Sequence, residues 1–188
     1  MQTVSQRLAL LRQRMAQRGL DACVVVTDDF HGSEYVGEHF KTRAYLSGFT
    51  GSAGTLLVLA EEAYLWTDGR YFLQAERQLT GSGIELMRAG QPGLPTLSSF
   101  LAEKLPEGGA LGFDGRTVST KLYRTLEKAL AGRHVHMDGG FDPAEGVWTD
   151  RPPLSAAPVW ALESGGKSWR CCGRIWRRGT RRICCSPT

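Results

Sequence analysis

The sequence predicts an α/β domain in which a mixed β-sheet is covered by helices on both faces. Short apolar runs of strand length alternate along the chain with segments whose apolar residues recur every three or four positions. Residues 22–26 are apolar throughout, as expected for a strand that is buried on both faces. Residues 56–59 and 64–66 are joined by a short turn, which indicates an antiparallel pair.

The first helix is predicted from apolar residues at helical spacing, with Ser5 as its expected N-cap and Gly19 as its expected stop. Those apolar residues are Val4, Leu8, Leu11 and Met15. A polar loop is expected from Asp28 to about Lys41. The other predicted strands cover 84–87, 110–113 and 134–137, and the other predicted helices cover 71–79, 97–105 and 122–130. Gly132 is expected to end the last helix, and residues 148–153 are expected to form an extended segment that leads out of the domain.

Basic residues and cysteines are unevenly distributed. The 188 residues carry a net charge of +4, but residues 163–188 hold seven basic side chains against one acidic one. The first 162 residues hold 16 basic and 18 acidic side chains and one cysteine, Cys23, which excludes a disulfide framework there. No apolar run is long enough to span a membrane. We therefore predict a domain at 1–162 and an arginine- and cysteine-rich tail at 163–188.

The tail lacks the apolar stripe of a helix, and its mixture of Trp, Arg, Cys and Gly is typical of a GC-rich gene read out of frame. A one-base shift in codons chosen for residues 167–178 yields Val-Leu-Ala-Val-Leu-Arg-Glu-Asp-Met-Ala-Ala, which has an amphipathic pattern. The hypothesis is that the tail is disordered or frameshifted. The alternative is a tail that binds nucleic acid or metal, although its Cys-Cys pairs do not have the usual C-x₂-C zinc spacing.

Residues 48–55 contain three glycines and precede a strand. A phosphate-binding loop follows a strand, opens a helix and usually carries a lysine, so this stretch does not fit one. Close backbone packing, or contact with a ligand or another domain, fits better. Ser52 lacks the Gly-x-Ser-x-Gly surroundings of an esterase nucleophile.

Polar residues elsewhere give weaker signals. His134 and His136 would share one face of a strand, and an exposed edge strand is a simpler interpretation than a metal site. Asp68 is expected to cap the following helix, and Arg70 to pair with a local carboxylate. The tripeptide Asp-Gly-Arg recurs at residues 114–116, again between a strand and a helix.

Four stretches together resemble a known family. They are residues 28–35 (DDFHGSEY), 47–55 (SGFTGSAGT), 65–75 (LWTDGRYFLQA) and 148–152 (WTDRP). They are similar to the N-terminal domain of three-domain Xaa-Pro aminopeptidases (aminopeptidase P) of the creatinase/prolidase family, over about residues 5–162. The resemblance implies a ribonuclease-H-like α/β fold. It also implies a metallopeptidase that removes the residue before proline with two divalent metals, commonly manganese, held in a separate C-terminal domain.

By the same resemblance, this domain borders the entrance to the active site. The residues expected on that substrate-access or domain-interface surface are His31, Glu34, Tyr35, Arg43, Gly48, Thr50, Gly51, Asp68 and Arg70. We assign no catalytic residue, metal ligand or cofactor to the chain itself, and we expect the chain alone to be inactive.

The expected partners are the second and catalytic domains of such an enzyme and, at full length, proline-containing peptides. We expect a cytoplasmic location and neither membrane nor nucleic-acid binding. The alternative function is that of a free-standing interaction module.

Overall fold

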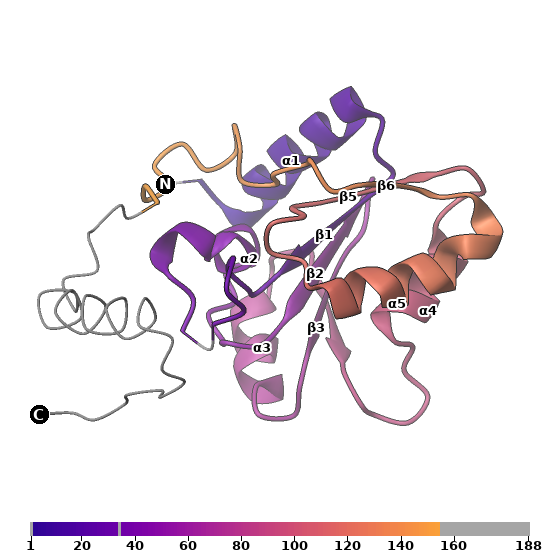
Figure 1. The fold of residues 1–188 in the computed structure, drawn as a ribbon. Coiled ribbons are helices and arrows are strands. Elements are labelled where there is room, and N and C mark those ends of the chain that lie inside the picture. The colour runs from indigo at the N-terminus through magenta and orange to yellow at the C-terminus, as the bar shows by residue number, and fades with distance from the viewer. Residues whose placement is uncertain (1, 34, 155–188) are drawn as a thin grey trace, which may run out of the picture. The chain divides into compact units, whose positions relative to one another are not determined.

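Six strands form one sheet in the order β4-β3-β2-β1-β5-β6 (Figure 1). The computed structural model describes residues 2–33 and 35–154, and the described residues up to Pro152 belong to one compact unit. The strands are β1 (Ala22–Val26), β2 (Thr55–Leu59), β3 (Ala63–Thr67), β4 (Glu85–Arg88), β5 (Ala110–Phe113) and β6 (His136–Asp138). β2 pairs antiparallel with β1 and β3, whereas the β3–β4, β1–β5 and β5–β6 pairs are parallel. The predicted mixed sheet and the antiparallel pair are confirmed.

Helices cover both faces of this sheet, as predicted (Figure 1). The α-helices are α1 (Val4–Arg18), α2 (Thr42–Ser47), α3 (Phe72–Leu79), α4 (Leu97–Lys104) and α5 (Thr120–Leu130). The 3₁₀-helices are η1 (Glu38–Phe40) and η2 (Ala131–Arg133). Buried residues of α1, α2 and α3 belong to one apolar cluster, and those of α4 and α5 belong to another on the opposite face.

The central strand β1 contributes to both apolar clusters because successive side chains point to opposite faces. Cys23 and Val25 belong to the cluster under α1, and Ala22 and Val24 to the cluster under α4 and α5. Burial raises the pKa of the Cys23 thiol, which therefore stays protonated at neutral pH. The uninterrupted apolar run in the sequence thus marked a strand that is buried on both sides.

Two predicted helix ends are wrong. The N-cap of α1 is Thr3, not Ser5: Thr3 Oγ1 accepts from the backbone N–H of Gln6, whose side chain accepts from the N–H of Thr3. This reciprocal pair satisfies two amides that Ser5, already inside the helix, does not reach. At the other end of α1, Gly19 adopts the left-handed conformation (φ 71°), as predicted. α5 ends at Leu130 and continues as η2, so Gly132 lies inside η2 and does not end the helix.

Residues 148–152 do not form the extended exit that the sequence predicts. The indole of Trp148 stacks on Tyr45 of α2, with ring centroids 4.5 Å apart and planes 7° from parallel. Arg151 donates to the His39 carbonyl (2.8 Å) and to Asp142 (2.7 Å), and the His39 ring contacts the Pro152 carbonyl (2.7 Å). The prolines stop regular structure as expected, but a stacked ring and a half-buried ion pair hold the segment on the domain. The predicted boundary at residue 162 and the tail lie outside the described residues.

Asp142 is half-buried and accepts from Arg151 (2.7 Å), Arg116 (2.8 Å) and the backbone N–H of Ala144 (2.9 Å). Burial acts to raise the pKa of this carboxyl, but the hydrogen bonds and the two guanidinium groups outweigh it and lower the pKa. A carboxyl whose pKa is lower in the folded chain contributes stability above its unfolded pKa of about 4, and loses it as the pH falls through the folded value.

We therefore expect Asp142→Asn to lower the free energy of unfolding at pH 7 by about 1–3 kcal/mol. The dependence of stability on pH between about 5 and 3 should also become shallower in this variant. Urea unfolding followed by tryptophan fluorescence measures both quantities. Asp150→Asn, at an exposed aspartate, is the matched control and should match the parent chain. Parallel pH curves for the parent and Asp142→Asn would contradict the expectation.

Candidate functional site

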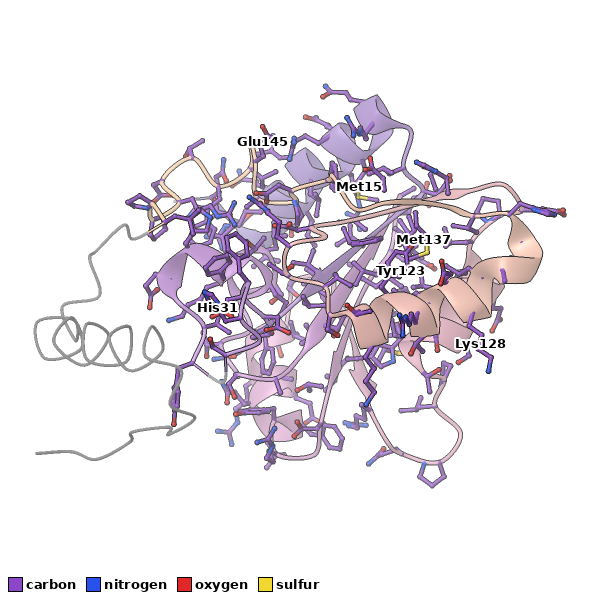
Figure 2. The ribbon with its side chains drawn as sticks, viewed as in Figure 1. Met15, His31, Tyr123, Lys128, Met137 and Glu145 are labelled. Carbon is purple, nitrogen blue, oxygen red and sulfur yellow. The ribbon has the colours of Figure 1, made fainter. Side chains whose placement is uncertain are left out.

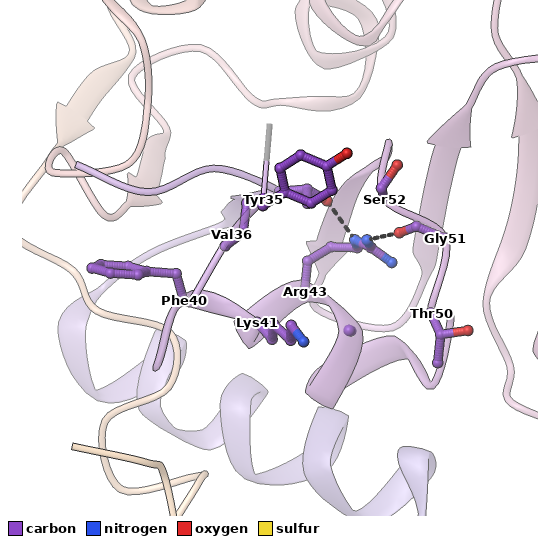
Figure 3. A pocket seen from close by; sticks show the side chains of 10 residues that line it. Tyr35, Val36, Phe40, Lys41, Arg43, Thr50, Gly51 and Ser52 are labelled. Carbon is purple, nitrogen blue, oxygen red and sulfur yellow. Dashed lines mark hydrogen bonds between the residues drawn. The ribbon is translucent and has the colours of Figure 1, made fainter. Parts of the chain in front are cut away.

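A pocket of about 380 Å³ opens between the segment around η1 and α2 and the loop that precedes β2 (Figure 3). Its lining residues are Thr27, Tyr35, Val36, Phe40, Lys41, Arg43, Ala44, Thr50, Gly51 and Ser52. Residues 48–54 are called the glycine loop below. Four of the nine predicted surface residues line the pocket: Tyr35, Arg43, Thr50 and Gly51. The volume is that of a site for a small ligand or a short stretch of peptide.

Arg43 connects α2 to the glycine loop. It is only 2% exposed, and its guanidinium donates to Thr27 Oγ1 (2.8 Å) and to the carbonyls of Phe49 and Gly51. The same group lies 4.8 Å from the centre of the Phe49 ring. Thr27 in turn donates to the Gly54 carbonyl (2.9 Å), so one side chain and its partner hold three carbonyls of the loop.

The charge of Arg43 is not balanced by an ion pair with any described carboxylate, since its hydrogen-bond partners are two carbonyls and a hydroxyl. Burial lowers the pKa of Arg43 to about 10, against a smaller opposite effect of the Tyr71 hydroxyl. The guanidinium is still protonated at neutral pH and places a positive charge in the pocket wall. A planar, weakly hydrated cation with five donors is suited to such a buried position.

The helix α3 holds the other side of the glycine loop. Thr50 Oγ1 accepts from the side-chain amides of Gln74 and Gln78, both at 2.9 Å, and the backbone N–H of Thr50 donates to Gln78 Oε1 (2.9 Å). Ser52 and Tyr71 share a hydrogen bond of 2.7 Å between their hydroxyls. The loop is therefore tied to Thr27, which follows β1, and to α2 and α3, which makes it part of a rigid wall.

The Asp68–Arg70 pair lies beside the pocket but does not line it. Asp68 accepts from the backbone N–H (3.0 Å), Nε (2.9 Å) and Nη2 (2.8 Å) of Arg70, and the Arg70 side-chain hydrogen bond is the main cause of the lowered pKa of Asp68. The predicted pairing of Arg70 with a local carboxylate is confirmed. The predicted capping role of Asp68 is wrong: the N-cap of α3 is Tyr71, without a side-chain cap, because Asp68 is engaged in its own turn.

The second Asp-Gly-Arg adopts the same turn, with Asp114 accepting from Arg116 at 3.0, 2.8 and 2.8 Å. The shared tripeptide thus encodes one local structure, used twice after a strand. At the second copy Arg116 also reaches Asp142, which connects the turn to the half-buried ion pair near Arg151.

The other predicted surface residues do not line the pocket. His31 lies at the surface (Figure 2), where its backbone N–H donates to Asp29 Oδ1 (2.8 Å). Hydrogen bonds from the backbone of Ser33 and of His31 lower the pKa of Asp29. Gly48 ends α2 in the left-handed conformation (φ 73°). Glu34 lies outside the described residues.

Sequence reasoning missed several pocket residues, among them Thr27, Phe40, Lys41 and Ala44. The last three belong to η1 and α2 or adjoin them, in a segment where the sequence predicts only a polar loop and no helix at 42–47. A usable signal was present, because the apolar pair Tyr45-Leu46 is followed by Gly48, a typical helix stop. A helix of six residues is too short for a convincing periodic pattern.

His134 and His136, at the β6 edge of the sheet, do not form a set of metal ligands with a third described residue. β6 is an edge strand, as predicted, and His136 is exposed on it. His134 precedes the strand in a left-handed conformation (φ 51°). Among residues 2–33 and 35–154, no three His, Cys, Asp or Glu side chains come close enough together to hold a metal ion.

These features define a class of protein: an α/β domain with a mixed sheet and a ligand-sized pocket beside a rigid glycine-rich loop. The chain belongs to the creatinase/prolidase N-terminal domain family, whose family model matches residues 7–140. The resemblance seen in the sequence is therefore confirmed.

Relatives and solved structures agree with this assignment. Aminopeptidase P2 of Arabidopsis thaliana is 41% identical over 170 residues, which are 87% of this chain and 24% of that protein. The X-prolyl aminopeptidase of Caenorhabditis elegans, described as a cytosolic enzyme with a di-nuclear active site, has a TM-score of 0.74 at 28% identity, covering 94% of this chain and 32% of that one. The N-terminal domain of the cytoplasmic peptidase PepQ of Mycobacterium tuberculosis has a TM-score of 0.54 at 31% identity, covering 75% and 97%. The chain spans about a quarter of the length of the curated relatives it matches.

Gly51 gives a test of how rigid the glycine loop is. A Cβ at this position would lie 2.3 Å from Cζ of the buried Phe49 and 2.9 Å from Cδ1 of Tyr71. Because both rings are held by their neighbours, we expect Gly51→Ala to lower the free energy of unfolding by about 1–3 kcal/mol.

Gly69→Ala is the matched control, because a Cβ there would meet its nearest neighbour at an ordinary 3.8 Å. Urea unfolding of the two variants and the parent decides the point. Equal stability of Gly51→Ala and Gly69→Ala would show that the loop yields easily and is not a rigid wall.

Proposed function

We propose that this chain acts as the N-terminal, non-catalytic domain of an Xaa-Pro aminopeptidase, the enzyme class that removes an N-terminal residue preceding proline. The observation that supports this most is the match to the N-terminal domain family, combined with relatives named as such enzymes of which the chain covers only about a quarter to a third. In this role the pocket face, with Arg43 and the glycine loop, borders the entrance to an active site in another domain and shapes which peptides reach it.

The rigidity of the pocket face supports this role. A surface that selects peptides must keep its shape, and the glycine loop is tied down by Arg43, Gln74, Gln78 and Tyr71. Tyr35, whose side chain lies at the pocket mouth and is 87% exposed, offers an apolar surface for a second domain or a peptide. His31 and the Asp68–Arg70 turn are proposed to extend the same interface.

We assign the two divalent metals to the catalytic domain of such an enzyme, where manganese would activate a water molecule. The described residues of this chain do not fit the metals, because no group of three suitable ligands comes together among them. The proposed partners of this domain are the second and catalytic domains, and proline-containing peptides are the proposed substrates of the full-length enzyme.

A cytoplasmic location is proposed because the Caenorhabditis elegans neighbour is described as cytosolic. None of the helices in the described part of the chain has the length and apolar character needed to cross a membrane. The alternatives of a nucleic-acid or metal-binding tail depend on residues 163–188, which lie outside the described residues. No observation on the described residues favours them or a free-standing module over the proposed role.

We expect the purified 188-residue chain to show no turnover of an Xaa-Pro peptide in the presence of manganese, because no three His, Cys, Asp or Glu side chains of the described residues come together to hold a metal ion. Release of the N-terminal residue, followed by chromatography, measures this. A complete Xaa-Pro aminopeptidase assayed in parallel is the positive control. The assignment of a non-catalytic domain would be overturned by manganese-dependent turnover that exceeds the blank. This activity would also have to copurify with the chain through two columns.

A further inference from the structure

Arg43 is a buried cation in the wall of a pocket, and it has no acidic partner among the described residues. Arg14 and Arg151, whose side chains are 23% and 14% exposed, bind Glu145 and Asp142. Three further partly buried arginines, Arg7, Arg12 and Arg133, donate to backbone carbonyls instead, but Arg43 is more deeply buried than any of these. A buried charge is normally balanced by an opposite charge, because desolvation is costly. Arg43 is therefore a positive charge whose natural counterion is missing from the described part of the domain.

The other polar side chains of the pocket include several donors. The Tyr35 hydroxyl can donate or accept, whereas Thr50 Oγ1 faces Gln74 and Gln78 of α3. Ser52 and Tyr71 share one hydrogen bond, which leaves the proton of one of these two hydroxyls. Lys41 adds an ammonium at the rim, and none of the described lining residues is acidic. The Arg43 guanidinium and the Lys41 ammonium, which can only donate, favour a ligand that supplies acceptors.

The charge balance favours a single negative charge on the ligand. Lys41 is paired with Glu38, so this pair is neutral overall, and Arg43 leaves one positive charge that no carboxylate among residues 2–33 and 35–154 compensates. A monoanion balances it, whereas a phosphate dianion would leave excess negative charge in a partly desolvated site. The other walls, Tyr35, Val36, Phe40 and Ala44, are largely apolar and suit a hydrocarbon body (Figure 3).

We propose that this pocket binds the carboxylate of a small ligand with an apolar body, with the charge set against the wall formed by Arg43 and the glycine loop. The same chemistry is offered by the C-terminal residue of a short peptide and by a free organic acid. Such binding requires only the folded domain. It therefore does not depend on the peptidase role proposed above, and either proposal can fail without the other.

The test is a titration of the isotope-labelled 188-residue chain by NMR, with four probes: Ala-Pro-Phe, its C-terminal amide, 3-phenylpropionate and inorganic phosphate. We expect the free tripeptide to bind at least about tenfold more tightly than the amide, with shifts at the pocket residues and weaker binding at high salt. Binding of 3-phenylpropionate with similar affinity would identify the carboxylate and ring as sufficient. Much weaker binding of this acid would identify the peptide as the source. Equal binding of peptide and amide, or tighter binding of phosphate, would overturn the proposal.

Arg43 is unsuitable for substitution because it holds the glycine loop, so a steric variant is used. Ala44→Leu adds bulk to the pocket wall without changing its charge and should weaken binding at least about tenfold. Ala129→Leu, at a half-exposed alanine of α5 on the opposite face of the sheet, is the matched control and should bind as the parent does. Lys41→Gln should weaken binding only about two- to fivefold, because its exposed charge is already paired. Unchanged binding by a folded Ala44→Leu variant would show that the ligand lies elsewhere.

Discussion

The pocket face of this domain depends on one interaction, the burial of the Arg43 guanidinium among the carbonyls of Phe49 and Gly51 and the hydroxyl of Thr27. These acceptors come from two segments that are distant in sequence from each other, the end of β1 and the glycine loop. A single planar group with several donors can bind them together, which a lysine ammonium could not do with the same directionality. The domain thereby keeps a charged group in a position where an apolar side chain would leave loop carbonyls without donors.

The short helix α2 joins this clamp to the segment around residues 148–152. One of its residues, Arg43, faces the glycine loop, while Tyr45 stacks on Trp148 and Thr42 accepts from Arg151 (3.4 Å). The pocket wall and the end of the compact unit are therefore attached to the same six residues. In the proposed enzyme, a peptide-selecting surface and the exit of the chain toward further domains would be coupled through α2, although neither involves catalytic chemistry.

Strong local patterns predicted most of the fold. Each of three elements is specified by residues that are close together in the sequence. The spacing of Leu8, Leu11 and Met15 specifies α1, the apolar run 22–26 specifies β1, and the short turn after β2 specifies its antiparallel pairing with β3. The misses have separate causes. Whether Thr3 or Asp68 caps a helix depends on which of several nearby N–H donors its short side chain reaches. The helix α2 was missed because six residues are too few to show a periodic apolar pattern. Residues 148–152 resemble a linker because prolines follow the tryptophan, and only the stack on Tyr45 reveals otherwise.

The mixed α/β class, the family and the importance of the glycine-rich stretch could be predicted from the sequence, because they depend on apolar patterns and on short motifs that are contiguous in the chain. It also indicated Tyr35, Arg43, Thr50 and Gly51 as surface candidates. Only the tertiary structure decided that these four line one pocket, that Asp68 and His31 stand outside it, and that Arg43 is buried without a carboxylate among the described residues. Ion pairs, cavity walls and shared hydrogen bonds form between segments that are tens of residues apart in the sequence. A local sequence pattern therefore cannot predict them.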